Sequence, residues 1–154
     1  MSFKEKSAWI SLISTTCIFG YYFYSIFMLI GEPTEAARES AKDYLIQAVF
    51  LSIVVEIFFH AVLGLTSNKE TEIKGDERDK MYEYKANNLG YSVLGIGVIL
   101  SLVRIITLEH NPTWAEHYSA AQIPMQTAQI LMLFFILSEI VRFSGQVFYY
   151  RRGY

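Results

Sequence analysis

The sequence lacks the residues that disulfide-rich and cysteine-based metal proteins need. It contains a single cysteine, Cys17, which excludes an intrachain disulfide and a cysteine-based metal site. A charge of one sign is lacking too, because 13 Lys and Arg face 15 Asp and Glu, for a formal net charge of −2. We therefore expect neither a nucleic acid nor an acidic substrate as a partner.

Catalytic motifs are also missing. There is no Walker loop, no HExxH motif, no Ser-His-Asp arrangement and no pair of aspartates in a loop facing lipid headgroups. The run Gly90-x4-Gly95-x-Gly97 lacks the strand–turn–helix context of a nucleotide-binding fingerprint. We expect no enzyme activity and no cofactor.

Two acid–imidazole pairs, Glu109-His110 and Glu116-His117, are seven residues apart. Carboxylate and imidazole are competent zinc ligands, but no third histidine lies on that side and nothing fixes the geometry of the segment. We expect no metal site.

Long uncharged segments are what the sequence does have. Hydrophobic residues make up 53% of the chain, and the short gaps between the apolar runs carry nearly all the charge. A bilayer requires about 20 apolar residues for each helical crossing. The pattern predicts an all-α polytopic membrane protein, a single domain of four transmembrane helices arranged as two hairpins. The helices are expected at about 8–30, 44–65, 89–108 and 124–148, with Pro124 in the first turn of the last one.

The first apolar run, residues 8–30, contains no charge, and no small-residue cleavage site follows it. We expect a retained helix rather than a signal peptide.

Basic residues predict the orientation. Nine of them lie in the N-terminal tail, in the segment 66–88 and at the C-terminus, whereas the two other connectors hold only Arg38 and Lys42. By the positive-inside rule, both termini and the loop 66–88 are expected in the cytoplasm.

Glu56 and His60 are the first candidates for an ion or proton site. They are four residues apart in the second apolar run, so they share a helix face with Ser52. A carboxylate at this depth costs several kcal/mol unless it is paired, protonated or hydrated. Glu56 is therefore expected to face the interior, near a polar group of another helix. It either titrates there, with His60 as a relay, or stays neutral, hydrogen-bonded to His60 and Ser52, and holds helices together.

Glu139 and Arg142 form a matching element in the fourth run. Their i, i+3 spacing allows an ion pair. Counted from the outer helix ends, Glu56 and Glu139 lie at depths of about 18 and 22 Å. This similarity makes the four residues the candidate ion or proton site.

Small residues along the third run, Gly90, Gly97 and Ser101, indicate close helix packing. Arg104 follows on the same stripe and is expected to reach the outer interface or Glu109.

The segment before the third run begins with an N-cap signal, Gly75-Asp76. An amphipathic stretch, residues 80–87, follows, so we expect a helix that starts near Asp76 and continues into the membrane. Asp76, Arg78 and Asp79 are candidates for docking a cytoplasmic partner.

The string Asp76-Glu77-Arg78-Asp79, followed by Lys85-Ala86 and a helix containing Tyr91, resembles a motif of small uncharacterised prokaryotic four-helix membrane proteins. The resemblance implies a multi-pass protein of a prokaryotic inner membrane. It implies no activity and no functional residues.

Three functional hypotheses remain. The first is an ion or small-solute transport or channel subunit, a homo-oligomer in the lipid bilayer that uses Glu56 and Glu139. The second is a non-catalytic regulatory or partner-binding module that acts through residues 66–88. An enzyme acting on lipids or quinones ranks third.

Overall fold

The computed structural model describes residues 3–32, 34–66, 77–111 and 124–153. Within these ranges the chain folds into four helices and contains no strand: α1 (Phe3–Met28), α2 (Thr34–Thr66), α4 (Glu77–His110) and α6 (Gln126–Arg152). Each helix is long and apolar enough to cross a membrane. The all-helical fold class with four membrane-spanning segments is therefore confirmed.

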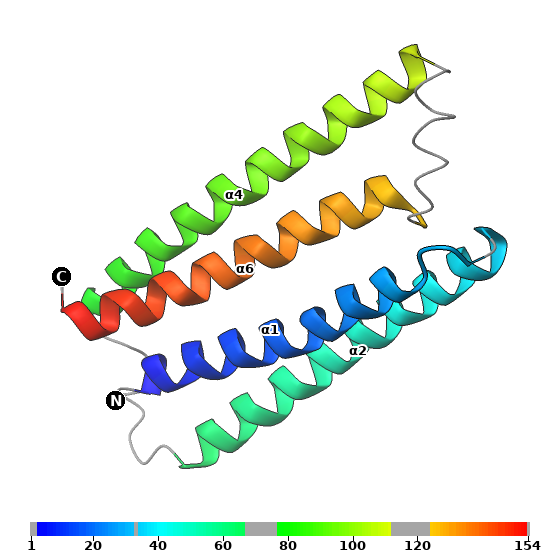
Figure 1. Cartoon of the computed structure of the whole chain (residues 1–154). Coiled ribbons are helices and arrows are strands. Elements are labelled where there is room, and N and C mark those ends of the chain that lie inside the picture. Colours follow the sequence, from blue (N-terminus) through cyan, green and yellow to red (C-terminus); the bar gives the residue numbers. More distant parts are fainter. Residues whose placement is uncertain (1–2, 33, 67–76, 112–123, 154) are drawn as a thin grey trace.

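The helices lie side by side in the order α4, α6, α1, α2, with the two ends of the chain at the same end of the molecule (Figure 1). The extensive interfaces join α4 to α6, α6 to α1 and α1 to α2. The helices α2 and α4 therefore form the two edges. Only 6% of the apolar window of α2 is buried within the chain, compared with 33% in α1, so α2 is the most exposed helix.

All four helices are longer than the apolar runs predict, α2 and α4 by the largest margins. Helix α2 begins at Thr34, so the connector expected up to residue 43 is wrong. Ala37 and Ala41, buried in this segment, explain why it is helical and packed. Helix α4 begins at Glu77, in agreement with the start expected near Asp76, although Asp76 lies outside the described residues. At 33 and 34 residues, these helices are about 50 Å long and exceed the hydrocarbon thickness of about 30 Å.

The start of α6 also differs from the expectation. Pro124 lies in a turn before the helix rather than in its first turn, and Met125 has a left-handed backbone with φ 54°. The helix begins at Gln126 and ends before Gly153, whose N–H donates to the carbonyl of Tyr149.

The core is formed where α1 lies between its two neighbours. Phe19, Tyr22 and Ile26 of α1 pack with two alanines of α2, Ala41 and Ala48, and with Ile136 of α6. Alanine adds little width, so α2 can approach the aromatic side chains of α1 closely.

The interface between α4 and α6 depends on small residues. A Cβ atom added at Gly97 would lie 2.1 Å from Cβ of Phe134, and one added at Gly90 would lie 2.8 Å from the carbonyl oxygen of Ser138. Ser101 is buried on the same stripe of α4. The three positions proposed for helix packing therefore lie on the packed side of α4.

Replacing Gly97 with Ala should destabilise the protein. The new methyl group would overlap Cβ of Phe134, an atom that no side-chain rotation can move, and such overpacking costs about 1–3 kcal/mol. Gly95 on the same helix has no atom within 4 Å of an added Cβ, so Gly95→Ala should be neutral or stabilising by up to about 1 kcal/mol. Thermal unfolding in detergent measures both, and equal melting temperatures for the two variants would contradict this packing.

Candidate functional site

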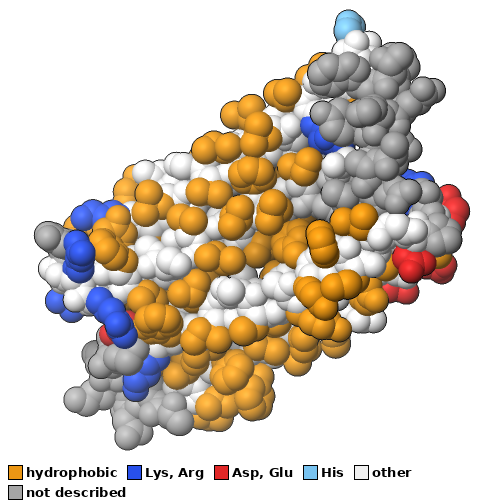
Figure 2. Space-filling model, viewed as in Figure 1, with side chains coloured by type: hydrophobic (Ala, Val, Ile, Leu, Met, Phe, Trp, Pro, Cys, Tyr) orange, Lys and Arg blue, Asp and Glu red, His pale blue; other side chains and the backbone are white. Residues whose placement is uncertain are grey.

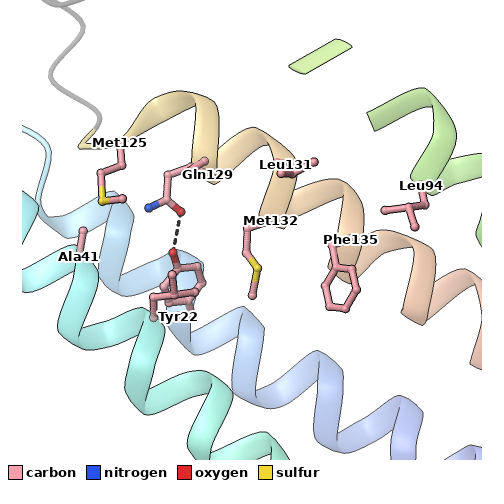
Figure 3. A pocket seen from close by; sticks show the side chains of 10 residues that line it. Tyr22, Ala41, Leu94, Met125, Gln129, Leu131, Met132 and Phe135 are labelled. Carbon is pink, nitrogen blue, oxygen red and sulfur yellow. Dashed lines mark hydrogen bonds between the residues drawn. The ribbon is translucent and has the colours of Figure 1, made fainter. Parts of the chain in front are cut away.

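A pocket of about 320 Å³ lies in the outer half of the helix layer, the half away from the chain ends (Figure 3). We call this pocket, together with the helix faces that continue from its lining residues toward the chain ends, the groove. All four helices line the pocket, and α6 supplies half of the residues. The lining residues are Tyr22, Ala41, Leu45, Leu94, Met125, Ala128, Gln129, Leu131, Met132 and Phe135.

One polar pair belongs to this apolar pocket. Tyr22 is only 2% exposed, and its hydroxyl donates to Oε1 of Gln129 at 2.7 Å. This bond joins α1 to α6 and satisfies the hydroxyl hydrogen within the apolar surroundings.

Glu56 lies on the side of α2 that borders this groove. It follows Leu45 by eleven residues and Ser52 by four, spacings that keep all three on one helix face. The side chain is half-buried. Within the described part of the chain, Glu56 forms neither an ion pair nor a hydrogen bond.

The polar residues near Glu56 in sequence have other partners. The Ser52 hydroxyl donates to the carbonyl of Val49. His60 is exposed, and its Nδ1 lies 3.4 Å from Oγ of Ser7 on α1. The hydrogen bonds considered between Glu56, Ser52 and His60 are therefore not formed in this structure.

Glu139 and Arg142 form an ion pair on α6, as their spacing predicts. The Arg142 guanidinium also lies over the ring of Phe143, 4.3 Å from its centre. Glu139 follows Met132 by seven residues and Phe135 by four, so it continues the face of α6 that lines the pocket.

Glu56 and Glu139 thus lie on faces of α2 and α6 that continue from the pocket, but among the described residues no hydrogen bond or ion pair joins Glu56 or His60 to the Glu139–Arg142 pair. Helices α2 and α6 run in the same direction in Figure 1, from the pocket toward the end that holds both termini. Glu56 lies about 16 Å beyond Leu45, and Glu139 lies about 6 Å beyond Phe135, at 1.5 Å per residue. The groove is apolar in its outer half and carries the acidic residues farther along.

Arg104 contributes to the opposite end of the layer. Its guanidinium donates to Oε1 of Gln126, which joins α4 to the first residue of α6. The expected contact between Arg104 and Glu109 lies outside the described residues, because the side chain of Glu109 is not described.

Ion pairs connect three helices at the end that holds both termini. Lys4 of α1 binds Glu83 of α4 at 2.9 Å, and Glu5 of α1 lies 3.8 Å from Arg151 of α6. The Arg151 guanidinium also covers the ring of Trp9 at 5.3 Å. The segment of α4 before residue 89 is therefore fastened to the rest of the protein.

Tyr82 is the centre of this attachment. It is 1% exposed, stacks on Tyr149 with ring centres 6.0 Å apart and meets Tyr150 edge-on at 5.4 Å. Arg78 lies over the other side of the cluster, 5.9 Å from the Tyr82 ring, and Lys85 lies 5.7 Å from the Tyr149 ring.

Of the docking candidates, Arg78 is exposed and Asp79 is half-buried. Asp76 lies outside the described residues. The sequence reasoning missed Tyr82, although a signal was present, because Tyr82, Ala86 and Gly90 are spaced by four and continue the packed stripe of α4. Tyr22 and Gln129 were also missed, and Gln129 is an uncharged polar residue in an apolar helix seven positions before buried Ile136.

Among the described residues, no group of three His, Cys, Asp or Glu side chains could hold a metal ion. Glu116 and His117 lie outside those residues.

Four long apolar helices, exposed hydrophobic side chains on the outside and charges gathered at the two ends (Figure 2) define an integral membrane protein. The chain belongs to the family described as "Predicted membrane protein (DUF2178)", which matches residues 14–154. The resemblance to an uncharacterised membrane family is thereby confirmed. No curated protein and no solved structure matches the chain.

Replacing Tyr82 with Ala should release the first three turns of α4. Truncating a buried aromatic side chain costs on the order of 3 kcal/mol, and here the loss falls on the contact between α4 and the end of α6. Hydrogen exchange should therefore accelerate in residues 77–88. Tyr84, 73% exposed, is the matched control, and Tyr84→Ala should leave exchange unchanged. Equal exchange in both variants would show that Tyr82 does not anchor the segment.

Proposed function

We propose that this protein is a subunit of an oligomeric membrane assembly that moves a proton or a small cation along the groove. The observation that carries the proposal is the placement of Glu56 and Glu139 on the groove-lining faces of two membrane-crossing helices. Acidic residues within membrane segments mark ion and proton paths because their burial is costly.

Charge balance distinguishes the two carboxylates. Arg142 pairs with Glu139 within one helix, so the two charges compensate each other. Glu56 has no such counterion among the described residues. Glu56 is therefore the group that takes up and releases the transported ion, while the Glu139–Arg142 pair shapes the field of the groove.

The exposure of α2 supports assembly. A carboxylate that faces hydrocarbon without a partner costs several kcal/mol, and little of the apolar window of α2 is buried within one chain. A second copy over the groove would supply polar contacts or enclose water beside Glu56. The homo-oligomer is thus part of the proposed site.

The proposed topology has two hairpins, α1 with α2 and α4 with α6, and both termini in the cytoplasm of a prokaryotic cell. On the face shown in Figure 2, more Lys and Arg side chains lie at the end with the termini than at the other end. This asymmetry supports the proposed orientation.

A regulatory module that binds a partner is the second candidate. The first turns of α4 present exposed Arg78 on a segment that Tyr82 holds against α6. A fixed and exposed surface at the membrane boundary suits the docking of a partner protein and has no role in transport.

Reporter fusions test the orientation. Fusions after Ser2 and Tyr154 should report the cytoplasm, and a fusion at Asn111 should report the outer side, because nine basic residues lie on one side of the helices. An outer-side signal from either terminus would overturn the topology.

Reconstitution in liposomes tests transport. Glu56→Gln removes the titrating group but keeps the shape of the side chain, so pH-driven flux should fall roughly tenfold or more, as expected for the loss of a charge-assisted contact. Glu39→Gln, at an exposed position on the same helix, is the matched control and should retain flux. If the native protein carries no flux, or if the two variants are equal, the transport proposal is wrong and the docking function is favoured.

A further inference from the structure

The pocket in the outer half of the groove has properties that the proposed ion site does not need. It is apolar, encloses about 320 Å³ and is lined by two methionines, Met125 and Met132, whose flexible side chains adapt to different shapes. Sites for small molecules commonly combine such a lining with a few polar groups that fix the ligand's orientation.

Tyr22 determines which polar atom faces this pocket. Its buried hydroxyl hydrogen needs an acceptor, and Oε1 of Gln129 supplies it at 2.7 Å. Turning the amide around would place an N–H group against the hydroxyl and leave its hydrogen without that acceptor. The amide nitrogen of Gln129 is consequently directed toward Met125 and Ala41, two other lining residues (Figure 3).

The orientation leaves a donor for a ligand. Within the described residues, Nε2 of Gln129 forms no hydrogen bond. A pocket that offers N–H donors in apolar surroundings discriminates against a ligand without an acceptor, because the donors would then stay unpaired.

We propose that the pocket binds a neutral, lipid-soluble molecule that carries a carbonyl oxygen, with the oxygen accepting from Nε2 of Gln129 and the apolar body lying between Met132, Phe135 and Leu94. The site is separate from Glu56 and Glu139, so its test does not depend on ion transport.

Photolabelling with benzophenone in lipid nanodiscs provides the assay. Benzophenone has a carbonyl oxygen and inserts readily at methionine on illumination, so label at Met125 or Met132, identified by mass spectrometry, reports occupancy of the pocket. Two competitors of nearly equal shape, hexanophenone and hexylbenzene, differ by one carbonyl group. Hexanophenone should protect the methionines at a mole fraction in the lipid that is roughly three- to tenfold lower, the range expected for one hydrogen bond.

Two variants assign the difference to the amide. The double variant Tyr22→Phe/Gln129→Leu should bring the two competitors within about twofold of each other, whereas Gln129→Leu alone would free the Tyr22 hydroxyl to donate to the ligand. Tyr22→Phe keeps the ring against Phe19 but frees the amide to rotate, so it should also reduce the difference. Gln47→Leu, which changes a separate pocket between α1 and α2, is the control and should retain it. Each variant must show the native melting profile, so that a loss of discrimination reports the site.

Comparing nanodiscs of two phospholipids identifies which molecule supplies the carbonyl group in nature. Stronger labelling in nanodiscs of ether-linked phospholipid than in ester-linked phospholipid identifies a lipid ester as the natural occupant, and equal labelling identifies a free ligand. Equal protection by hexanophenone and hexylbenzene in the native protein would overturn the proposal and indicate an ordinary acyl chain. Discrimination that survives the double variant Tyr22→Phe/Gln129→Leu would overturn it as well.

Discussion

The close approach of α4 to α6 is the constraint on which the rest of the arrangement depends. Apolar side chains gain little by leaving lipid for a helix interface, so packing at short distance and polar contacts must hold the helices together. Gly90 and Gly97 make that distance short, and Arg104 and Tyr82 add contacts near the two ends. Because α6 also packs against α1, the position of α4 determines how one side of the groove is formed.

Helix α2 lies at an edge of the layer and is packed less extensively than the other helices. Helix α2 has its extensive interface with α1. Three alanines of α2 are buried: Ala37, Ala41 and Ala48. Beyond Ala48 the helix carries Glu56 and His60 along a segment with little burial. A helix that is stable in lipid by its own backbone hydrogen bonds does not require a neighbour, but an acidic side chain on it does. The segment that is least packed within the chain thus holds the residue with the greatest need for a partner.

Hydrophobic patterning sufficed to predict the four helices, since about 20 predominantly apolar residues in a row leave few alternatives. It failed at the boundaries that tertiary contacts decide. Residues 34–43 are rich in charge, yet they are helical, and Ala37 and Ala41 in this segment are buried. The pairing of Glu139 with Arg142 followed from spacing within one helix. The hydrogen bond between Tyr22 and Gln129 could not be predicted, because the two residues are 107 positions apart in sequence and the bond depends on the relative rotation of α1 and α6.

The two halves of the groove differ in polarity and charge. The outer half satisfies its buried hydroxyl internally, through Tyr22 and Gln129, and leaves an apolar space with one kind of donor. Farther along, the Glu139–Arg142 pair is balanced, whereas Glu56 has no counterion among the described residues. A neutral molecule suits the first environment, because no charge must leave water to enter it. The second is where the proposed ion or proton path lies, because a carboxylate without a counterion is costly within a membrane.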